Sequence, residues 1–401
     1  MISLRQELGQ ANLFAAVVLF ALLTMAASSK KEPISPESYV GDNKCLSCHA
    51  DKQTYLQTAH RLTSSLPTRE TIKGNFRQGQ NTLKTTNPDL SFRMDATANG
   101  FTETAVIGAA PDAITHTERL DLVIGSGRKG QTYLYRKGDR LFELPVSYWT
   151  ELNNWVNSPG YVDDFPNFER PVSPRCLECH ATYFDSVTFQ DPSNRYKKSG
   201  FILGISCEKC HGPGREHVAR SSAARATSAG EAIVNPAKLP RGRQLDICAV
   251  CHAGIGVALL APAFSYTPGK PLQDYIELAA PDPNVKIDVH GNQVMLLQRS
   301  RCFESSPAMS CTTCHNVHVQ QRNAAGFSNR CLTCHKEDSC GEFKTKGPGI
   351  AMNCIDCHMP IQESNLIVSG FEGKQVRAKL RSHWIRIYPQ DSDGGENSDR
   401  H

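Results

Sequence analysis

Seven short segments of the chain share the pattern Cys-x-x-Cys-His, which places two thiols and an imidazole at fixed intervals. On a helical turn, residues three and four apart share one face, so both thiols can form thioethers with a single macrocycle. The histidine after the second cysteine then lies under the iron as a proximal ligand. This spacing is the attachment signature of a c-type haem. The cysteine pairs are Cys45 and Cys48, Cys176 and Cys179, Cys207 and Cys210, Cys248 and Cys251, Cys311 and Cys314, Cys331 and Cys334, and Cys354 and Cys357, and the histidines after them are His49, His180, His211, His252, His315, His335 and His358.

Zinc sites and redox-active cysteine pairs are the alternative interpretation of these cysteines. The seven motifs use fourteen of the 16 cysteines, and a histidine follows every pair although the chain has only 14 histidines in 401 residues. A zinc site does not require a histidine at that position. The sequence therefore predicts seven covalently attached haem c groups, each with its iron.

The chemistry at each iron depends on its sixth ligand. Iron with two histidine ligands suits electron transfer, whereas an open position can bind a small molecule. His217 and His318 follow a motif so closely that each can reach only a neighbouring haem. The predicted distal ligands are His60, His116, His217, His290, His318 and His383.

One more histidine, His401, is the last residue of a polar tail, and we expect it to be a poor ligand. At least one haem is then left for a methionine, for another group or for an open position. Met295 and Met309 are the methionine candidates. A Cys-x-x-Cys-Lys motif, which marks the catalytic haem of pentahaem nitrite reductases, is absent from the sequence.

Cys302 and Cys340 lie outside the motifs. In an exported protein two leftover cysteines most often form a disulfide. We expect a bridge between them to close the C-terminal part of the chain.

The N-terminal segment, residues 1–29, is typical of a secretory signal peptide, with an uncleaved membrane anchor as the alternative. Its apolar run, residues 11–27, is seventeen residues long, short for a membrane span of about twenty. Small residues follow the run. Covalent haem attachment takes place outside the cytoplasm in bacteria, so we expect a periplasmic or otherwise extracytoplasmic protein.

Composition and motif spacing divide the remaining chain into six segments. These are a linker (30–40), a first haem-binding segment (41–64), a β-rich insertion (65–170), a segment with haems two to four (171–260), a C-terminal cluster of haems five to seven with a closing segment (261–387), and a disordered tail (388–401). Outside the insertion, so few residues per haem cannot build an ordinary core. We therefore expect a mostly α and irregular multihaem cytochrome with little regular secondary structure and a haem-packed core, plus a small antiparallel β insertion.

Within the insertion, alternating apolar residues predict strands, and residues 131–146 predict a hairpin that turns at Lys137, Gly138 and Asp139. The glycine cluster at residues 125–130 is interpreted as a tight loop, because it lacks both a Walker lysine-serine pair and a Rossmann context. The aromatic stretch 145–170 has no clear period, and we expect it to be a loop that packs on a haem.

The formal net charge is +4. Each haem adds two propionates, partly offset by the ferric core, so the holoprotein carries on the order of a few negative charges. This balance gives no support for binding to nucleic acid. The expected partners are redox proteins, namely a quinol-side or periplasmic electron donor and a terminal acceptor. Membrane association is expected only if residues 1–29 stay uncleaved.

Several stretches beyond the bare motifs carry a family resemblance, among them GISCEKCHGPGREH, CTTCHNVH and IGSGRKGQTYLY. From about Tyr39 to Ile387 the chain resembles exported multihaem cytochromes related to the tetrahaem cytochrome that accepts electrons from hydroxylamine oxidoreductase. It is most similar to bacterial multihaem proteins that often carry C-terminal tetratricopeptide repeats, although it stops where such repeats would begin. The resemblance implies His217, His318 and His60 as distal ligands.

Three hypotheses for function follow. The first is an electron-transfer protein in which closely packed haems connect redox partners. The second is a multihaem oxidoreductase of hydroxylamine or of nitrogen or sulfur oxyanions, with one open haem and with Arg128, Lys129, Tyr133 and His116 as candidate catalytic groups. The third is a subunit of an extracellular haem filament. The number of irons that lack a sixth ligand separates the first two.

Overall fold

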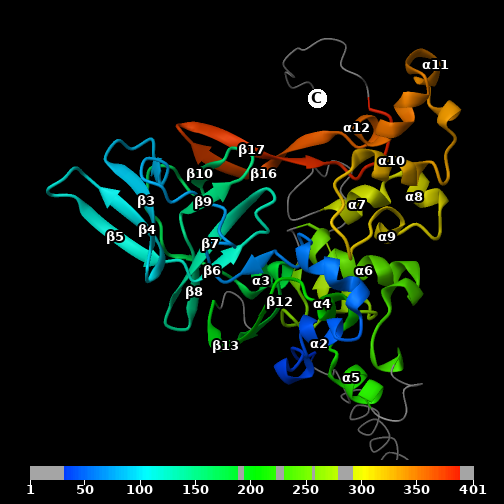
Figure 1. The fold of residues 1–401 in the computed structure, drawn as a ribbon, viewed down its shortest axis with the longest axis horizontal. Coiled ribbons are helices and arrows are strands. Elements are labelled where there is room, and N and C mark those ends of the chain that lie inside the picture. The colour runs from blue at the N-terminus through cyan, green and yellow to red at the C-terminus, as the bar shows by residue number, and fades with distance from the viewer. Residues whose placement is uncertain (1–30, 188–193, 223–229, 255–257, 279–291, 389–401) are drawn as a thin grey trace, which may run out of the picture.

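The computed structural model describes residues 31–187, 194–222, 230–254, 258–278 and 292–388. The predicted signal peptide, His290 and His401 lie outside the described residues. Helix makes up 30% of the structure and strand 28%. The expectation of a mostly α and irregular fold is therefore wrong. Antiparallel sheets fill one side of the molecule, and short helices fill the other (Figure 1).

The helices are short, and loops and turns separate those that carry the motifs. The α-helices are α2 (Asp42–Leu46), α3 (Pro174–His180), α4 (Cys207–His211), α5 (Arg215–Ser222), α6 (Arg241–His252), α7 (Gln293–Gln298), α8 (Arg301–Ser305), α9 (Cys311–Cys314), α10 (Ala324–Cys331), α11 (Phe343–Lys346) and α12 (Cys354–His358). The 3₁₀-helices are η1 (Pro36–Ser38), η2 (Ala50–Gln57), η4 (Pro236–Lys238), η5 (Leu272–Asp274), η6 (Glu337–Ser339) and η7 (Pro348–Asn353). In the described ranges, none of these helices has both the length and the apolar character of a membrane span.

Two antiparallel sheets form the β region. The first has the order β2 (Thr82–Lys84), β3 (Leu90–Thr97), β4 (Gly100–Ile107) and β5 (Ile114–Arg119). The second has the order β1 (Ser64–Ser65), β6 (Leu122–Ile124), β7 (Gly130–Lys137), β8 (Arg140–Glu143) and β11 (Arg170–Pro171), with β9 (Val146–Trp149) paired to β7 and to β10 (Asn154–Asn157). The predicted hairpin is confirmed, since Lys137 pairs with Arg140 across a two-residue turn.

The β region buries a side-chain core of its own, and this is why a haem-packed core was the wrong expectation. Leu90, Phe92 and Met94 alternate with more exposed residues along β3, so one face of the strand is apolar. They pack with Tyr133 and Trp155, both fully buried. The aromatic stretch 145–170 therefore contributes strands to this core; it is not a loop on a haem.

Three further two-stranded sheets lie beside the motif helices. They are β12 (Ala181–Ser186) with β13 (Tyr196–Leu203), β14 (Ala258–Leu259) with β15 (Ile276–Glu277), and β16 (Ile361–Phe371) with β17 (Lys374–Arg381). The last hairpin turns at Glu372 and Gly373, whose φ angles of 50° and 72° suit a tight two-residue turn. Its strand β16 packs against β10 of the β region (Figure 1).

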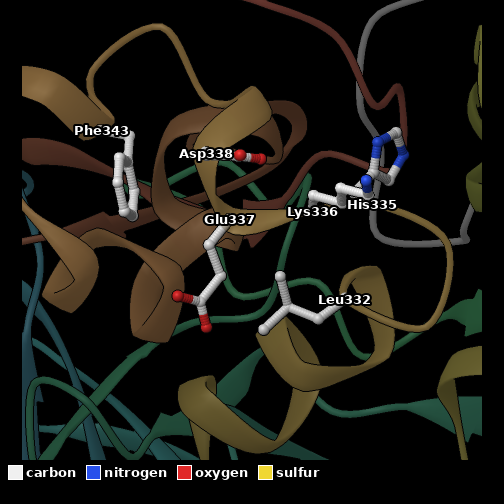
Figure 2. A pocket seen from close by; sticks show the side chains of 6 residues that line it. All are labelled: Leu332, His335, Lys336, Glu337, Asp338 and Phe343. Carbon is white, nitrogen blue, oxygen red and sulfur yellow. The ribbon is translucent and has the colours of Figure 1, made fainter.

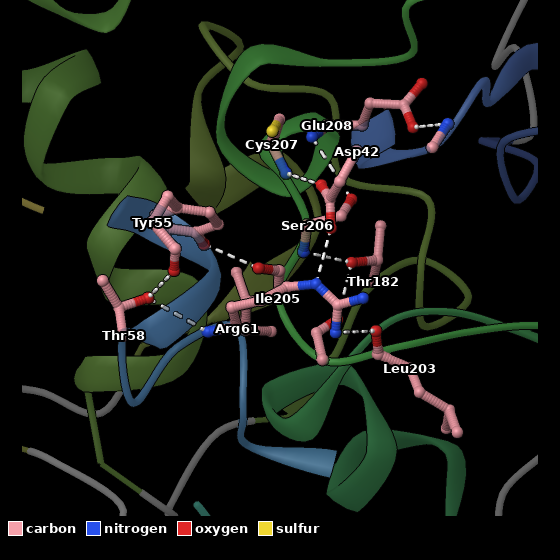
Figure 3. A network of polar contacts seen from close by, with 12 residues as sticks. Asp42, Tyr55, Thr58, Arg61, Thr182, Leu203, Ile205, Ser206, Cys207 and Glu208 are labelled. Carbon is pink, nitrogen blue, oxygen red and sulfur yellow. Dashed lines mark hydrogen bonds and ion pairs between the residues drawn. The ribbon is translucent and has the colours of Figure 1, made fainter. Parts of the chain in front are cut away.

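A polar network ties the chain around α2 to β13 and α4 (Figure 3). Arg61 Nε donates to the Asp42 carboxylate at 2.5 Å, and Arg61 Nη1 donates to the Leu203 carbonyl at 3.3 Å. Asp42 also accepts from the backbone N–H of Cys207 at 3.0 Å. Gly204 permits this close approach, because a Cβ there would lie 2.0 Å from the Arg61 carbonyl oxygen. The first and third motifs are thereby fixed to each other.

Replacing Asp42 by asparagine tests this network. The variant removes the charge that balances the half-buried Arg61, so we expect a loss of roughly 2 kcal/mol of unfolding free energy. Chemical denaturation of the holoprotein measures it. Asp51→Asn is the matched control, since the Asp51–Lys52 pair is exposed; its midpoint should equal that of the wild type. Equal stability of the two variants would contradict the role given to Asp42.

A second prediction concerns Glu103 on β4, which is fully buried. Its Oε1 accepts from the Val146 N–H at 3.0 Å, while Oε2 is without a hydrogen-bond partner in the described residues. Burial raises the pKa of this carboxyl well above its ordinary value. The folded state therefore holds a proton that the unfolded state releases, so stability falls as pH rises above the ordinary carboxyl pKa.

Glu103→Gln should therefore stabilise the protein at neutral pH, by roughly 1 kcal/mol or more, and should flatten the fall in stability between about pH 5 and pH 8. Thermal unfolding followed by circular dichroism at both pH values checks this. The exposed Glu169→Gln is the control. A variant that keeps the wild-type pH dependence would show that Glu103 does not cause it.

Candidate functional site

Each Cys-x-x-Cys-His motif forms a single helical turn in the structure. The backbone N–H of the motif histidine donates to the carbonyl of the first cysteine, four residues earlier, in the first, fifth and sixth motifs. The distance is 2.9 Å between His49 and Cys45, between His315 and Cys311, and between His335 and Cys331. Both thiols and the imidazole therefore extend from one turn, as attachment to a single macrocycle requires.

Four motif histidines face a histidine from a distant part of the chain. In each pair the ring centres lie just over 6 Å apart. The pairs, with ring-centre distance and interplanar angle, are His49 with His217 (6.4 Å, 20°), His211 with His318 (6.1 Å, 24°), His315 with His383 (6.2 Å, 26°) and His60 with His252 (6.1 Å, 77°).

This separation fits one iron between two imidazoles. A metal–nitrogen bond to histidine is about 2 Å long, which places each ring centre roughly 3 Å from the metal and the two centres roughly 6 Å apart. Rings in van der Waals contact would be closer. The donor set, two cysteines and two histidines on opposite sides, matches a covalently attached haem with two axial ligands.

Hydrogen bonds fix several of the rings. His211 Nδ1 lies 2.8 Å from the Val234 carbonyl, and His358 Nδ1 lies 2.9 Å from the Arg386 carbonyl. A carbonyl can only accept, so Nδ1 carries the proton and Nε2 keeps its lone pair for a metal. His180 Nδ1 lies 3.1 Å from the hydroxyl of Thr63.

Burial also disfavours the protonated form of five of the paired histidines. It lowers the pKa of His252 to about 4 and that of His383 to about 4. It lowers the pKa values of His60, His315 and His318 as well. The neutral imidazole is the form that binds a metal, because protonation occupies the lone pair.

The helices that carry the motifs contact one another in a defined order. Asp42 joins α2 to α4 through the Cys207 N–H, and His60, from the segment after the first motif, faces His252 on α6. On α3, Arg175 donates to the Val250 carbonyl of α6 at 2.6 Å. The first motif segment therefore adjoins the third and the fourth motifs, and the second motif adjoins the fourth.

The order continues toward the C-terminus. Ser310, at the start of α9, donates to Gln244 of α6 at 2.9 Å. The Phe327 ring of α10 lies 5.2 Å from the His315 ring. Ser328 of α10 accepts from the Cys354 N–H of α12 at 3.0 Å. The motif segments thus form a connected series: the first adjoins the third and the fourth, the fourth adjoins the second and the fifth, and the sixth adjoins the fifth and the seventh.

The sixth motif borders an open hollow of about 500 Å³ (Figure 2). Leu332 and Phe343 give it apolar walls, and Lys336, Glu337 and Asp338 line it beside His335. The motif histidine is exposed at this hollow. A haem held by Cys331 and Cys334 would be bordered by these side chains and would be accessible to solvent.

Other predicted residues are not brought together. His116 lies on β5, where its ring packs 4.4 Å from the Phe168 ring and its Nε2 contacts Glu118 at 3.1 Å. Tyr133 is buried in the core of the β region, whereas Lys129 pairs with Glu151 at the surface. The candidate catalytic groups of the insertion therefore do not converge.

The two leftover cysteines are both free thiols in the structure, and the expected bridge is not formed. Cys302 lies on α8, and Cys340 directly follows η6. Met309 packs on the apolar cluster beside Cys311, and Met295 lies on α7. The assignment of either methionine as a ligand stays a prediction.

Residues that hold the motifs in place were not predicted. Glu208 lies within the third motif, and its carboxylate accepts from the N–H groups of Val40, Gly41 and Gly214 at 2.8 to 2.9 Å. Glu178, within the second motif, accepts from Arg175 at 2.6 Å and from the Phe264 N–H at 2.8 Å. An acidic residue between two motif cysteines is the signal that could have identified them.

Comparison with known proteins adds one match. The family model described as cytochrome c554 and c-prime matches residues 162–212, which include the second and third motifs. Neither the curated proteins nor the solved structures contain a match to the chain. The family match supports a c-type cytochrome, an electron carrier with covalently bound haem.

Proposed function

We propose that this chain is an exported heptahaem cytochrome c that passes electrons along its haems between redox partner proteins. The observation that carries the proposal is the set of four histidine pairs. In each pair a motif histidine faces a second histidine at the spacing of one iron. Iron with both axial positions filled by histidine has no vacant position for a substrate, and its chemistry is the gain and loss of an electron.

The contacts between motif helices support conduction over the whole array. Electronic coupling between redox groups falls steeply with distance, so an electron carrier requires its groups to lie close together. Side-chain hydrogen bonds hold α2 to α4, α3 to α6, α6 to α9 and α10 to α12. These residues set the spacing, and the paired histidines would keep the four irons between them in one coordination state during turnover.

A count of histidines favours a second candidate, a multihaem oxidoreductase of small nitrogen or sulfur compounds with one open haem. Four of the seven histidines outside the motifs are paired with four motif histidines. His116 contacts Phe168 and Glu118 on β5. Only His290 and His401 then remain in the sequence for three motifs, those of His180, His335 and His358. At least one iron would lack a second histidine from its own chain.

Spectroscopy of the oxidised holoprotein decides between the candidates. We expect seven haems per chain by the pyridine haemochrome assay and at least four low-spin irons by quantified EPR. If cyanide, nitrite and hydroxylamine change no signal, the protein is an electron carrier alone. A high-spin signal that shifts with these ligands would support the oxidoreductase. Fewer than four haems per chain would refute both proposals.

The pairing itself is tested by His318→Ala. This variant removes the histidine that faces His211, so one low-spin signal per chain should be replaced by a high-spin signal.

His116→Ala is the matched control, since it also removes a histidine that lies outside the motifs, in this case on β5. Its spectrum should equal that of the wild type. Loss of a low-spin signal in the control would show that the distal ligands have been assigned incorrectly.

A further inference from the structure

Helix α6 differs from the other motif helices in its apolar surroundings. It has 12 residues and buries Leu245, Ala249 and Val250. The residues beside its cysteines belong to an apolar cluster that includes Leu272, Tyr275 and Ile276 from the following segment. By contrast, the buried residue of α2 is Asp42, and that of α4 is Glu208. The fourth motif therefore lies in a more apolar environment than the first and third.

The histidine pair of the fourth motif also differs in geometry. The His60 and His252 rings make an angle of 77°, whereas the other three pairs make angles of 20° to 26°. Backbone contacts hold His60 in place: its carbonyl accepts from the Ile205 N–H at 3.0 Å, and the Tyr55 hydroxyl donates to the Ile205 carbonyl at 2.6 Å. Figure 3 shows Tyr55, Ile205 and Arg61 around this segment. These contacts fix the position of the segment that carries the His60 ring.

The angle between axial imidazoles controls the electronic state of low-spin ferric iron. Two iron d orbitals interact with the π systems of the rings. Parallel rings act on one of these orbitals and separate the two energies, which gives a rhombic EPR signal. Perpendicular rings act on both equally and leave them nearly degenerate, which gives a strongly anisotropic signal whose largest g value is displaced to low field. The protein therefore sets the electronic state of such an iron through the orientation of its two axial histidines.

The apolar surroundings of α6 affect the same iron in a second way, through its reduction potential. The ferric state carries one more positive charge than the ferrous state, and an apolar environment disfavours the additional charge. Reduction is therefore favoured where the surroundings are apolar. Among the four paired motifs, α6 is the helix that itself buries apolar side chains, since α2 and α4 each bury one acidic residue and α9 buries none. It also contacts α3 and α9.

We infer that the iron held by His60 and His252 is electronically distinct from the other three paired irons, and that it is the one of the four that is reduced first. It would collect electrons at the point where the second motif joins the main series of motifs. The inference rests on the proposed function, since it requires covalently bound haem at these motifs. It also adds to that function a direction of electron flow within the protein: electrons from the other motifs would collect at the fourth motif, on α6.

An EPR-monitored redox titration of the holoprotein tests the inference. We expect a strongly anisotropic low-spin signal that disappears at a higher potential than the rhombic low-spin signals. In His60→Ala this signal should be lost and a high-spin signal should replace it. The matched control His217→Ala removes a near-parallel ligand, so it should lose a rhombic signal and keep the anisotropic one. Haem content of both variants is measured alongside.

Persistence of the anisotropic signal in a haem-loaded His60→Ala variant would overturn the inference. So would a wild-type titration in which the anisotropic signal disappears only after the rhombic signals. A wild type with only rhombic low-spin signals would refute it as well, even if neither variant folds. A preparation without low-spin haem would instead refute the proposed function. The two failures are therefore distinguishable.

Discussion

The fold depends on the pairing of histidines from distant segments across single metal positions. His217 follows the third motif and faces His49 of the first, whereas His318 follows the fifth motif and faces His211 of the third. His60 follows the first motif and faces the fourth. Each pair joins two segments far apart in sequence. A metal between them would act as a cross-link, and because these links share segments, displacing the first or the third motif would disturb another motif.

The β region supplies rigidity that short helices cannot provide by themselves. Its core of aromatic and aliphatic side chains is independent of any cofactor, with Trp155 and Tyr133 fully buried. The hairpin β16–β17 packs on β10 and leads directly into His383. Ser300 then donates to the His383 carbonyl at 3.3 Å. A histidine close to the C-terminal end is thereby delivered to the fifth motif.

Conduction and ligand binding place opposite demands on a multihaem protein. The paired motifs satisfy the first demand, since a histidine lies on both sides of each metal position. The sixth motif lies at an exposed hollow lined by charged residues. Because of this hollow, an open haem at the C-terminal helices would be accessible to a small molecule or to a redox partner.

The sequence by itself determined the local chemistry. Attachment motifs depend on residues within one helical turn, so Cys45 to His49 and the six similar segments are recognisable from spacing alone. The hairpin at residues 131–146 was predictable for the same reason, because its alternation and its turn are local. The hairpin β16–β17 was missed although Glu372 and Gly373 form a two-residue turn, because the solvent-exposed strand β16 has weak alternation.

Only the tertiary structure decided which histidines face each other, in what order the motifs adjoin, and at what angle the rings meet. These properties depend on contacts between different segments of the chain, and some of these residues are more than a hundred positions apart, such as His60 with His252 and Asp42 with Cys207. A periodic pattern encodes which face of an element is apolar, but not which distant element covers it. The 77° angle at α6 belongs to a contact between the segment after the first motif and the fourth motif, and no local feature of the sequence specifies that contact.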